Sequence, residues 1–332
     1  MDDPPNLVKT DFSKMDLFVE IKNNKSKDPF VSNGEGGYYD FPFEKDTSGA
    51  EFYRGQLASC AAALARSQFR VHTFCVLMCA EGVRFIRWDR SGAIVTEMFN
   101  CVQEPHFLAE FFWRYSHLDH ERKGYDTSIS LVPEKAVIPQ EIFEMLKDKN
   151  LNPFSRRKVV ARREEFRMLR VPDRNNPEDE NEFIIWFCPE YTLHSPFGRG
   201  TRSMLAYDME KQAIVFLKDY WRAEGADKEG DIYSLLELNH VPNIPPFGKG
   251  NDVRKHATIT DALKAEQKTT WALPSKEMVP LRHYRMTLGV VGRPLTSFDS
   301  SRELVSVIAD AMEGKTSFVD LNMRPTPGLH SA

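Results

Sequence analysis

Apolar and polar residues alternate along several short segments of the chain, and this period of two predicts β-strands. The predicted strands cover residues 15–22, 70–79, 82–89, 93–99, 181–188, 212–219 and 282–291. The turn 89–92, Asp-Arg-Ser-Gly, favours a tight hairpin because Asp, Ser and Gly adopt the required backbone angles. Residues 195–208 read as a second hairpin, which contains two glycines.

Apolar residues spaced three and four apart predict amphipathic helices elsewhere. These helices cover residues 53–67, 104–116, 228–240 and 301–312. Pro105 stands near the start of the second helix, where a missing N–H costs nothing. The prolines of 241–246 end the third helix, and a polar loop follows before the last predicted strand.

The chain length of 332 residues predicts two domains, since single cores seldom grow beyond about 250–300 residues. Residues 154–182 are basic at first and then acidic and turn-rich, which marks the predicted boundary. We therefore expect an α+β protein, with a mixed α/β domain over 1–150 and a charged linker over 151–180. A second unit is expected over 181–312, followed by a divergent tail over 313–332.

The composition limits the kinds of partner and the compartment that we expect for this protein. With 41% hydrophobic and 28% charged residues the chain is typical of globular proteins, and its net charge of −4 provides no field that attracts nucleic acid. No apolar run is long enough to span a membrane, and the acidic start lacks a secretory signal. Five cysteines without a metal-binding spacing predict reduced thiols and no metal site, in the cytoplasm or nucleus.

The strongest candidate chemistry combines the glycine hairpin with a lysine. Gly198 and Gly200 lack a Cβ, so their backbone N–H groups can approach phosphate oxygens. Lys218 follows on the second of two strands, among apolar neighbours, where its ammonium can pair with nucleotide phosphates.

Such a lysine needs a carboxylate from a neighbouring helix, and two residues compete for that role. Glu229 is favoured, because Ile232, Tyr233 and Leu236 follow it as an inward stripe. Asp231 has a weaker stripe and a shorter side chain.

Longer motifs connect these features. They are YRGQLASCAAALA, RFIRWDRSGAIVTE, LAEFFWRY, FGRGTR, FLKDYWR, VPNIP, HYRMTLGVVGRPL and SRELVSVIADA. Over residues 11–312 the chain resembles the fungal-type protein kinase family. The resemblance implies a protein-kinase-like N-lobe over 181–312, with a five-stranded antiparallel sheet and one helix, that serves ATP- and Mg²⁺-dependent phosphorylation of protein Ser/Thr.

The resemblance also implies roles for individual residues. Gly198, Arg199 and Gly200 would form the nucleotide loop, and Lys218 would pair with the phosphates. Glu229, or Asp231, would hold Lys218, and the segment 290–295 would be the hinge, with Val291 and Gly292 facing adenine.

The chain departs from the family pattern near its end. No His-Arg-Asp motif follows Met312, and Asp320 with Asn322 does not restore the catalytic spacing. The aspartate of that motif accepts the substrate proton, and a following Asn and a further Asp hold Mg²⁺. We therefore expect a truncated, catalytically impaired form that at most binds ATP. An alternative is a non-enzymatic interaction module, in which the uncovered lobe face binds a protein partner.

The first domain has an alternative interpretation, a restriction-endonuclease-like core. Glu20 and Lys22 lie on one face of a predicted strand, and Gln56 follows on a helix. In a Mg²⁺-dependent nuclease such a carboxylate binds the metal and the lysine helps to activate water. The site would need a second acid, for which Asp11 and Asp16 are available. An edge strand with alternating charges is the favoured explanation of the pattern, because short motifs discriminate poorly.

Overall fold

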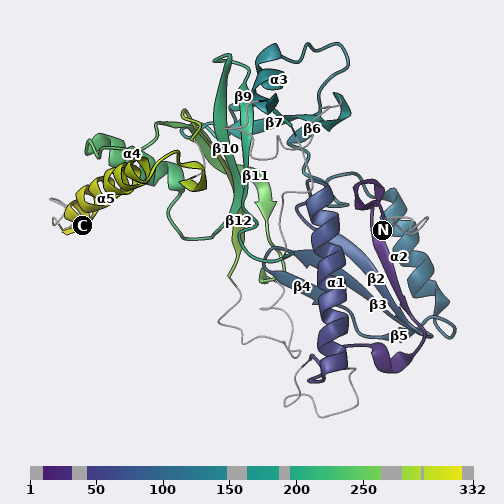
Figure 1. Cartoon of the computed structure of the whole chain (residues 1–332). Helices are drawn as coiled ribbons and strands as arrows, with labels where there is room; N and C mark the ends of the chain where they lie inside the picture. Colours follow the sequence, from purple (N-terminus) through teal and green to yellow (C-terminus); the bar gives the residue numbers. More distant parts are fainter. Residues whose placement is uncertain are drawn as a thin grey trace, which may run out of the picture.

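The computed structural model describes residues 10–31, 43–147, 163–186, 195–262, 279–292 and 295–323, which form two sheets and five helices (Figure 1). The strands are β1 (Phe18–Lys22), β2 (Thr73–Cys79), β3 (Gly82–Asp89), β4 (Gly92–Val95), β5 (Phe99–Asn100), β6 (Ile129–Leu131), β7 (Phe166–Pro172), β8 (Glu180–Trp186), β9 (Arg202–Asp208), β10 (Ala213–Ala223), β11 (Phe247–Ala257) and β12 (Leu281–Leu288). The helices are α1 (Ser48–Ser67), α2 (Pro105–His117), α3 (Gln140–Lys147), α4 (Glu229–Leu238) and α5 (Ser301–Met323).

The first sheet has the order β1-β2-β3-β4, and β5 also pairs with β3. β1 and β2 are parallel, which requires a crossover, and α1 supplies it. Helix α1 packs on one face of this sheet and α2 on the other (Figure 1). The first sheet with α1 and α2 is a mixed arrangement of helices and strands, and the turn 89–92 joins β3 to β4 as expected.

Apolar side chains hold these layers together. Leu57 and Leu64 of α1 pack with Cys75 and Cys79 of β2, so the two cysteines lie in the core. On the opposite face the rings of Phe85 and Phe111 stack at 4.2 Å.

The second sheet has the order β11-β12-β10-β9-β8-β7-β6, with every neighbouring pair antiparallel. It therefore has seven strands rather than the predicted five. The sheet curls, so that β11 at one end approaches the strand β7: the Asn251 amide donates to the carbonyls of Asp173 and Arg174, at 3.0 Å each.

The predicted boundary falls inside this second sheet. β7 lies within the predicted linker 151–180 and pairs with β8 of the second unit. β6 lies before residue 150 and extends the same sheet by pairing with β7. Helix α3 also belongs there, because Ile142 and Leu146 pack against Phe166 of β7. Charged flanking residues hide the strand pattern of β7, and residues 151–162 of the linker lie outside the described residues.

Two further predictions need correction. Residues 247–257, read as part of a polar loop, form β11, which pairs with β12. Helix α5 continues beyond residue 312 into the predicted tail 313–332, and the described part ends at Met323.

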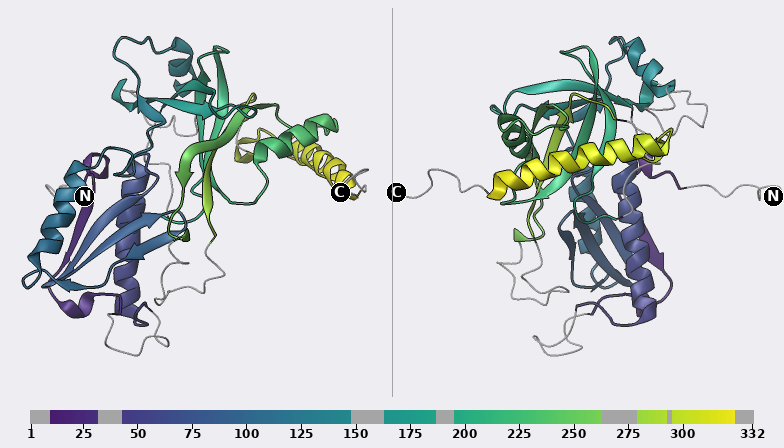
Figure 2. Two further views of the ribbon diagram at one scale, coloured as in Figure 1. Left: turned by 180° about the vertical axis from the view of Figure 1, so that it is seen from behind. Right: turned by 60° about the vertical axis from the view of Figure 1, so that its left-hand side comes forward.

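Helix α5 lies beside α4 and the segment that follows it (Figure 2). The Asn243 amide, just after α4, donates to the Asp310 carbonyl of α5 at 3.1 Å. No helix of the described ranges is both long enough and apolar enough to cross a bilayer.

Candidate functional site

Lys218 occupies the middle of β10, with β9 and β12 on either side: it pairs with Ser203 and Met286. Side chains alternate along this strand, so Phe216, Lys218 and Tyr220 share the face that carries α4. The Lys218 side chain is 23% exposed, so it is only partly buried.

The structure pairs Lys218 with Glu229 rather than with Asp231. Lys218 Nζ lies 2.8 Å from Glu229 Oε1 and 2.7 Å from Oε2, whereas the Asp231 carboxylate accepts from Arg174 Nε at 3.2 Å. Glu229 is the first residue of α4 and faces the sheet. The choice between the two acids, which the sequence left open, is thus decided by the placement of α4.

A close approach of α4 to the sheet fixes this placement. The Gly230 N–H donates to the Tyr284 hydroxyl at 2.9 Å. A Cβ on Gly230 would lie 2.7 Å from both Tyr284 Oη and the Phe247 ring, so only glycine fits. The helix end is therefore seated against β11 and β12 with Glu229 in reach of Lys218.

Tyr220 lies next to the ion pair. Its ring centroid is 4.8 Å from Lys218 Nζ and 4.9 Å from the Arg199 guanidinium, as in cation–π contacts. Burial and then the neighbouring Glu229 carboxylate raise the pKa of Tyr220, so its hydroxyl keeps its proton at neutral pH. Arg199, Lys218, Tyr220 and Glu229 therefore form one polar cluster on this face.

Residues 195–201, here called the glycine segment, precede β9 and lie beside the C-terminal half of β10. Gly198 and Gly200 have φ angles of 78° and 52°, which favour glycine. The Trp221 N–H donates to the Arg199 carbonyl at 2.7 Å and so ties the segment to β10. The Gly198 N–H donates to the Arg90 carbonyl at 2.8 Å, so in this arrangement it is already bonded.

The predicted hinge residues lie near the N-terminal end of β10, opposite the end that carries the glycine segment. Leu288 ends β12 and pairs with Phe216, and the chain then continues through Val291, which is half-buried, and Gly292, which is exposed. Lys218 is thus placed between the glycine segment and this stretch.

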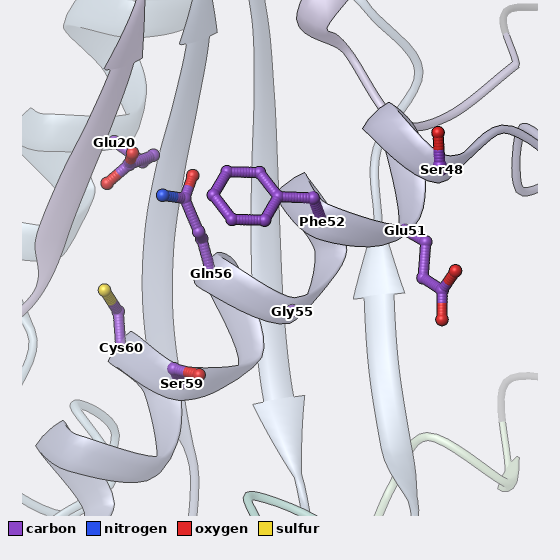
Figure 3. Close-up of a pocket in the computed structure, with 8 residues that line it drawn as sticks. All are labelled: Glu20, Ser48, Glu51, Phe52, Gly55, Gln56, Ser59 and Cys60. Atoms are coloured by element: carbon purple, nitrogen blue, oxygen red, sulfur yellow. The ribbon is translucent and has the colours of Figure 1, made fainter.

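The three residues of the nuclease interpretation also meet. Lys22 Nζ lies 2.6 Å from Glu20 Oε1 and 2.7 Å from Gln56 Oε1. Glu20 and Gln56 line an open pocket of about 700 Å³ between β1 and α1, in which Glu51 points away from Glu20 (Figure 3).

The second acid of that interpretation is engaged elsewhere. Asp16 accepts from Tyr125 and Lys123, and Asp11 accepts from Ser13. Neither shares the contacts of Glu20, which leaves a single carboxylate beside Lys22 among the described residues.

A buried cluster on the opposite face of β10 was not expected from the sequence. One ligand atom each from Asp126, His256 and His283 lies within 4.8 Å of the others. The two histidines face each other through their Nδ1 atoms at 3.0 Å, and Asp219 lies 2.6 Å from His283 Nε2. The sequence did contain a pattern that indicates such a cluster: Asp219, His283 and Arg285 alternate onto one face of their strands.

A buried guanidinium bridges the two carboxylates of this cluster. Arg285 donates to Asp126 at 2.9 Å and to Asp219 at 3.0 Å, so each carboxylate has a cationic hydrogen-bond partner. Although burial raises the pKa of Asp126, Arg285 and the histidines outweigh it and lower the pKa to about 2. Burial lowers the pKa of His256 to about 4.

A family model of the fungal protein kinase matches residues 43–323, which is most of the chain. No curated protein and no solved structure matches it significantly. The matched range contains the ion pair of Lys218 and Glu229 and the glycine segment. The chain therefore belongs to the fungal protein kinase family.

Proposed function

We propose that the second sheet and α4 bind ATP, and that the protein serves ATP-dependent phosphorylation of Ser or Thr in proteins. The contact between Lys218 and Glu229 carries this proposal. Protein kinases use a strand lysine, held by a helix glutamate, to bind nucleotide phosphates. The two side chains are 23% and 22% exposed, so a phosphate can reach the ammonium.

The order of features along β10 fits an elongated nucleotide. The glycine segment and Arg199 are tied to Trp221, on the C-terminal side of Lys218. Val291 and Gly292 follow the strand end that pairs with Phe216, on its N-terminal side. The phosphates would thus lie at Lys218 and the glycine segment, and the adenine at Val291 and Gly292.

The chemical step needs groups that the sequence does not identify. A kinase uses an aspartate to accept the substrate proton, and further Asp and Asn side chains to hold Mg²⁺, which neutralises the phosphate charge. The printed sequence contains no His-Arg-Asp motif. We propose that the described residues bind and orient ATP and that transfer by them alone is weak.

A protein lobe with the catalytic aspartate is the partner that we propose for the face formed by α4 and α5. These helices expose large apolar side chains: Leu235, Leu238, Val305, Ile308 and Met312. Apolar surface of this kind marks sites of protein association.

Titration calorimetry with ATP tests the proposal. We expect micromolar binding by the wild-type protein and its loss in Lys218→Met. Lys211→Met is the matched control, because Lys211 lies exposed in the turn between β9 and β10. Absence of ATP binding by the wild-type protein, or equal binding by Lys218→Met, would overturn the proposal.

A Mg²⁺-dependent nuclease is a second candidate, favoured by the contact of Lys22 with Glu20 and Gln56. It ranks lower, because Glu20 supplies one carboxylate where a metal usually needs more. Cleavage of plasmid DNA with Mg²⁺ that is lost in Glu20→Gln would support it, and no cleavage by the wild-type protein would exclude it.

A further inference from the structure

The turn between β3 and β4 contacts the second sheet at two places. Asp89, Arg90 and Ser91, here called the docking turn, lie between the glycine segment and residues 258–260, which follow β11. The first domain therefore contacts the candidate nucleotide site directly.

Arg90 holds the glycine segment. Its guanidinium donates to the carbonyls of Ser195 and Pro196, at 3.2 Å each, and its own carbonyl accepts from the Gly198 N–H at 2.8 Å. Arg90 is only 5% exposed, and burial lowers its pKa to about 10. A buried guanidinium needs acceptors, and here the backbone of the segment supplies two of them.

Gly200 passes directly over the same side chain. A Cβ at this position would lie 2.7 Å from Arg90 Cζ, and the φ angle of 52° also disfavours other residues. A larger residue at position 200 would push the segment and the guanidinium apart.

The docking turn is itself fixed by the second sheet. The Asp89 carboxylate accepts from the N–H groups of Ile259 and Thr260, at 2.9 and 3.1 Å. The Ser91 hydroxyl lies 2.7 Å from the Thr258 hydroxyl. Arg90 is thus held in a defined position relative to β11 and, through the sheet, to Lys218.

We propose that the first domain holds the glycine segment in place for the nucleotide, with Arg90 as the positioning residue. The proposal rests on ATP binding at Lys218. A segment with two glycines has many conformations to lose when a ligand orders it. Contacts that order it beforehand remove this cost and so increase affinity.

Hydrogen exchange of residues 195–201 and ATP titration, both on the full chain, test the proposal. In Arg90→Ala we expect exchange of these amides to rise more than about tenfold and ATP affinity to fall about tenfold, while exchange in β2 stays unchanged. Arg90→Lys, which keeps a donor, should restore part of both. Arg114→Ala, a substitution on the exposed face of α2, is the control.

Gly200→Ala provides a second test if Arg90→Ala does not fold. The new methyl group displaces the segment while Arg90 is intact, so exchange should rise and ATP affinity fall as well. Unchanged exchange at 195–201 in these variants would overturn the proposal, as would increased exchange spread equally over both sheets.

The two proposals fail in different ways. If exchange rises in Arg90→Ala but the wild-type protein does not bind ATP, Arg90 does hold the segment, and the proposal of ATP binding at Lys218 is wrong. If the wild-type protein binds ATP and the affinity of Arg90→Ala is unchanged, Arg90 has no positioning role.

Discussion

The ammonium of Lys218 lies 2.8 and 2.7 Å from the two carboxylate oxygens of Glu229, across the gap between β10 and α4. Two charges at this distance hold each other's side chain in one orientation. The pair therefore sets the direction in which the ammonium can meet an anionic ligand, and it couples the site to the position of α4.

Glu229→Gln should weaken ATP binding about tenfold, because the neutral amide no longer holds the Lys218 ammonium with a full charge. Stability should change by less than about 1 kcal/mol, since the pair is partly exposed. Calorimetry and urea unfolding measure the two effects. Asp231→Asn is the matched control, because Asp231 contacts Arg174 instead. Equal loss in both variants would contradict a specific role for Glu229.

Gly230→Ala should lower the free energy of unfolding by about 1–3 kcal/mol, because the methyl group meets Tyr284 Oη and the Phe247 ring at 2.7 Å. It should also weaken ATP binding, since α4 must move. Gly55→Ala is the control: this glycine of α1 has no atom within 4 Å of an added Cβ, and a gain of up to about 1 kcal/mol is expected. Urea unfolding that shows no difference between the two variants would contradict the packing argument.

Asp28→Ala should destabilise the protein by about 3–5 kcal/mol, because it removes the carboxylate that accepts from the buried guanidinium of Arg84. Arg84 is fully buried, and its guanidinium donates to Asp28 at 2.8–3.1 Å. Glu178→Ala removes an exposed partner of Arg254 and should cost at most about 1 kcal/mol. Chemical denaturation compares the two, and similar losses would show that burial of the Asp28 pair has no consequence.

Acid should destabilise the fold through His256. Burial lowers its pKa from 6.5 to about 4, so between these values the unfolded chain takes up a proton that the folded chain refuses. Stability is then highest above pH 6.5 and falls toward pH 4, by on the order of 3 kcal/mol. Asp126, with a pKa lowered to about 2, adds a further loss below its ordinary value of 3.8. Urea unfolding at several pH values measures this, and His256→Gln should show a flatter dependence between pH 6.5 and 4.5.

Local pattern was sufficient for much of the fold. The strand around Lys218, the hairpin at 89–92 and the proline-led helix α2 were all predicted, because each depends on alternation or turn chemistry within a few residues. The strands β6 and β7 were missed. β6 is three residues long, and β7 lies beside a charged stretch that suggested a linker.

The sequence by itself determined that a segment with two glycines, a strand with a lysine and a helix that begins with an acid follow one another along the chain. Each of these features depends only on residues close together in the sequence. Only the tertiary structure decided that Glu229 and not Asp231 meets Lys218, because the seat of α4 depends on Gly230, Tyr284 and Phe247. It also decided that Arg90 lies under the glycine segment more than 100 residues away. A contact between residues so far apart in the sequence depends on how the two sheets are placed relative to each other. The spacing of residues within one segment does not encode that placement.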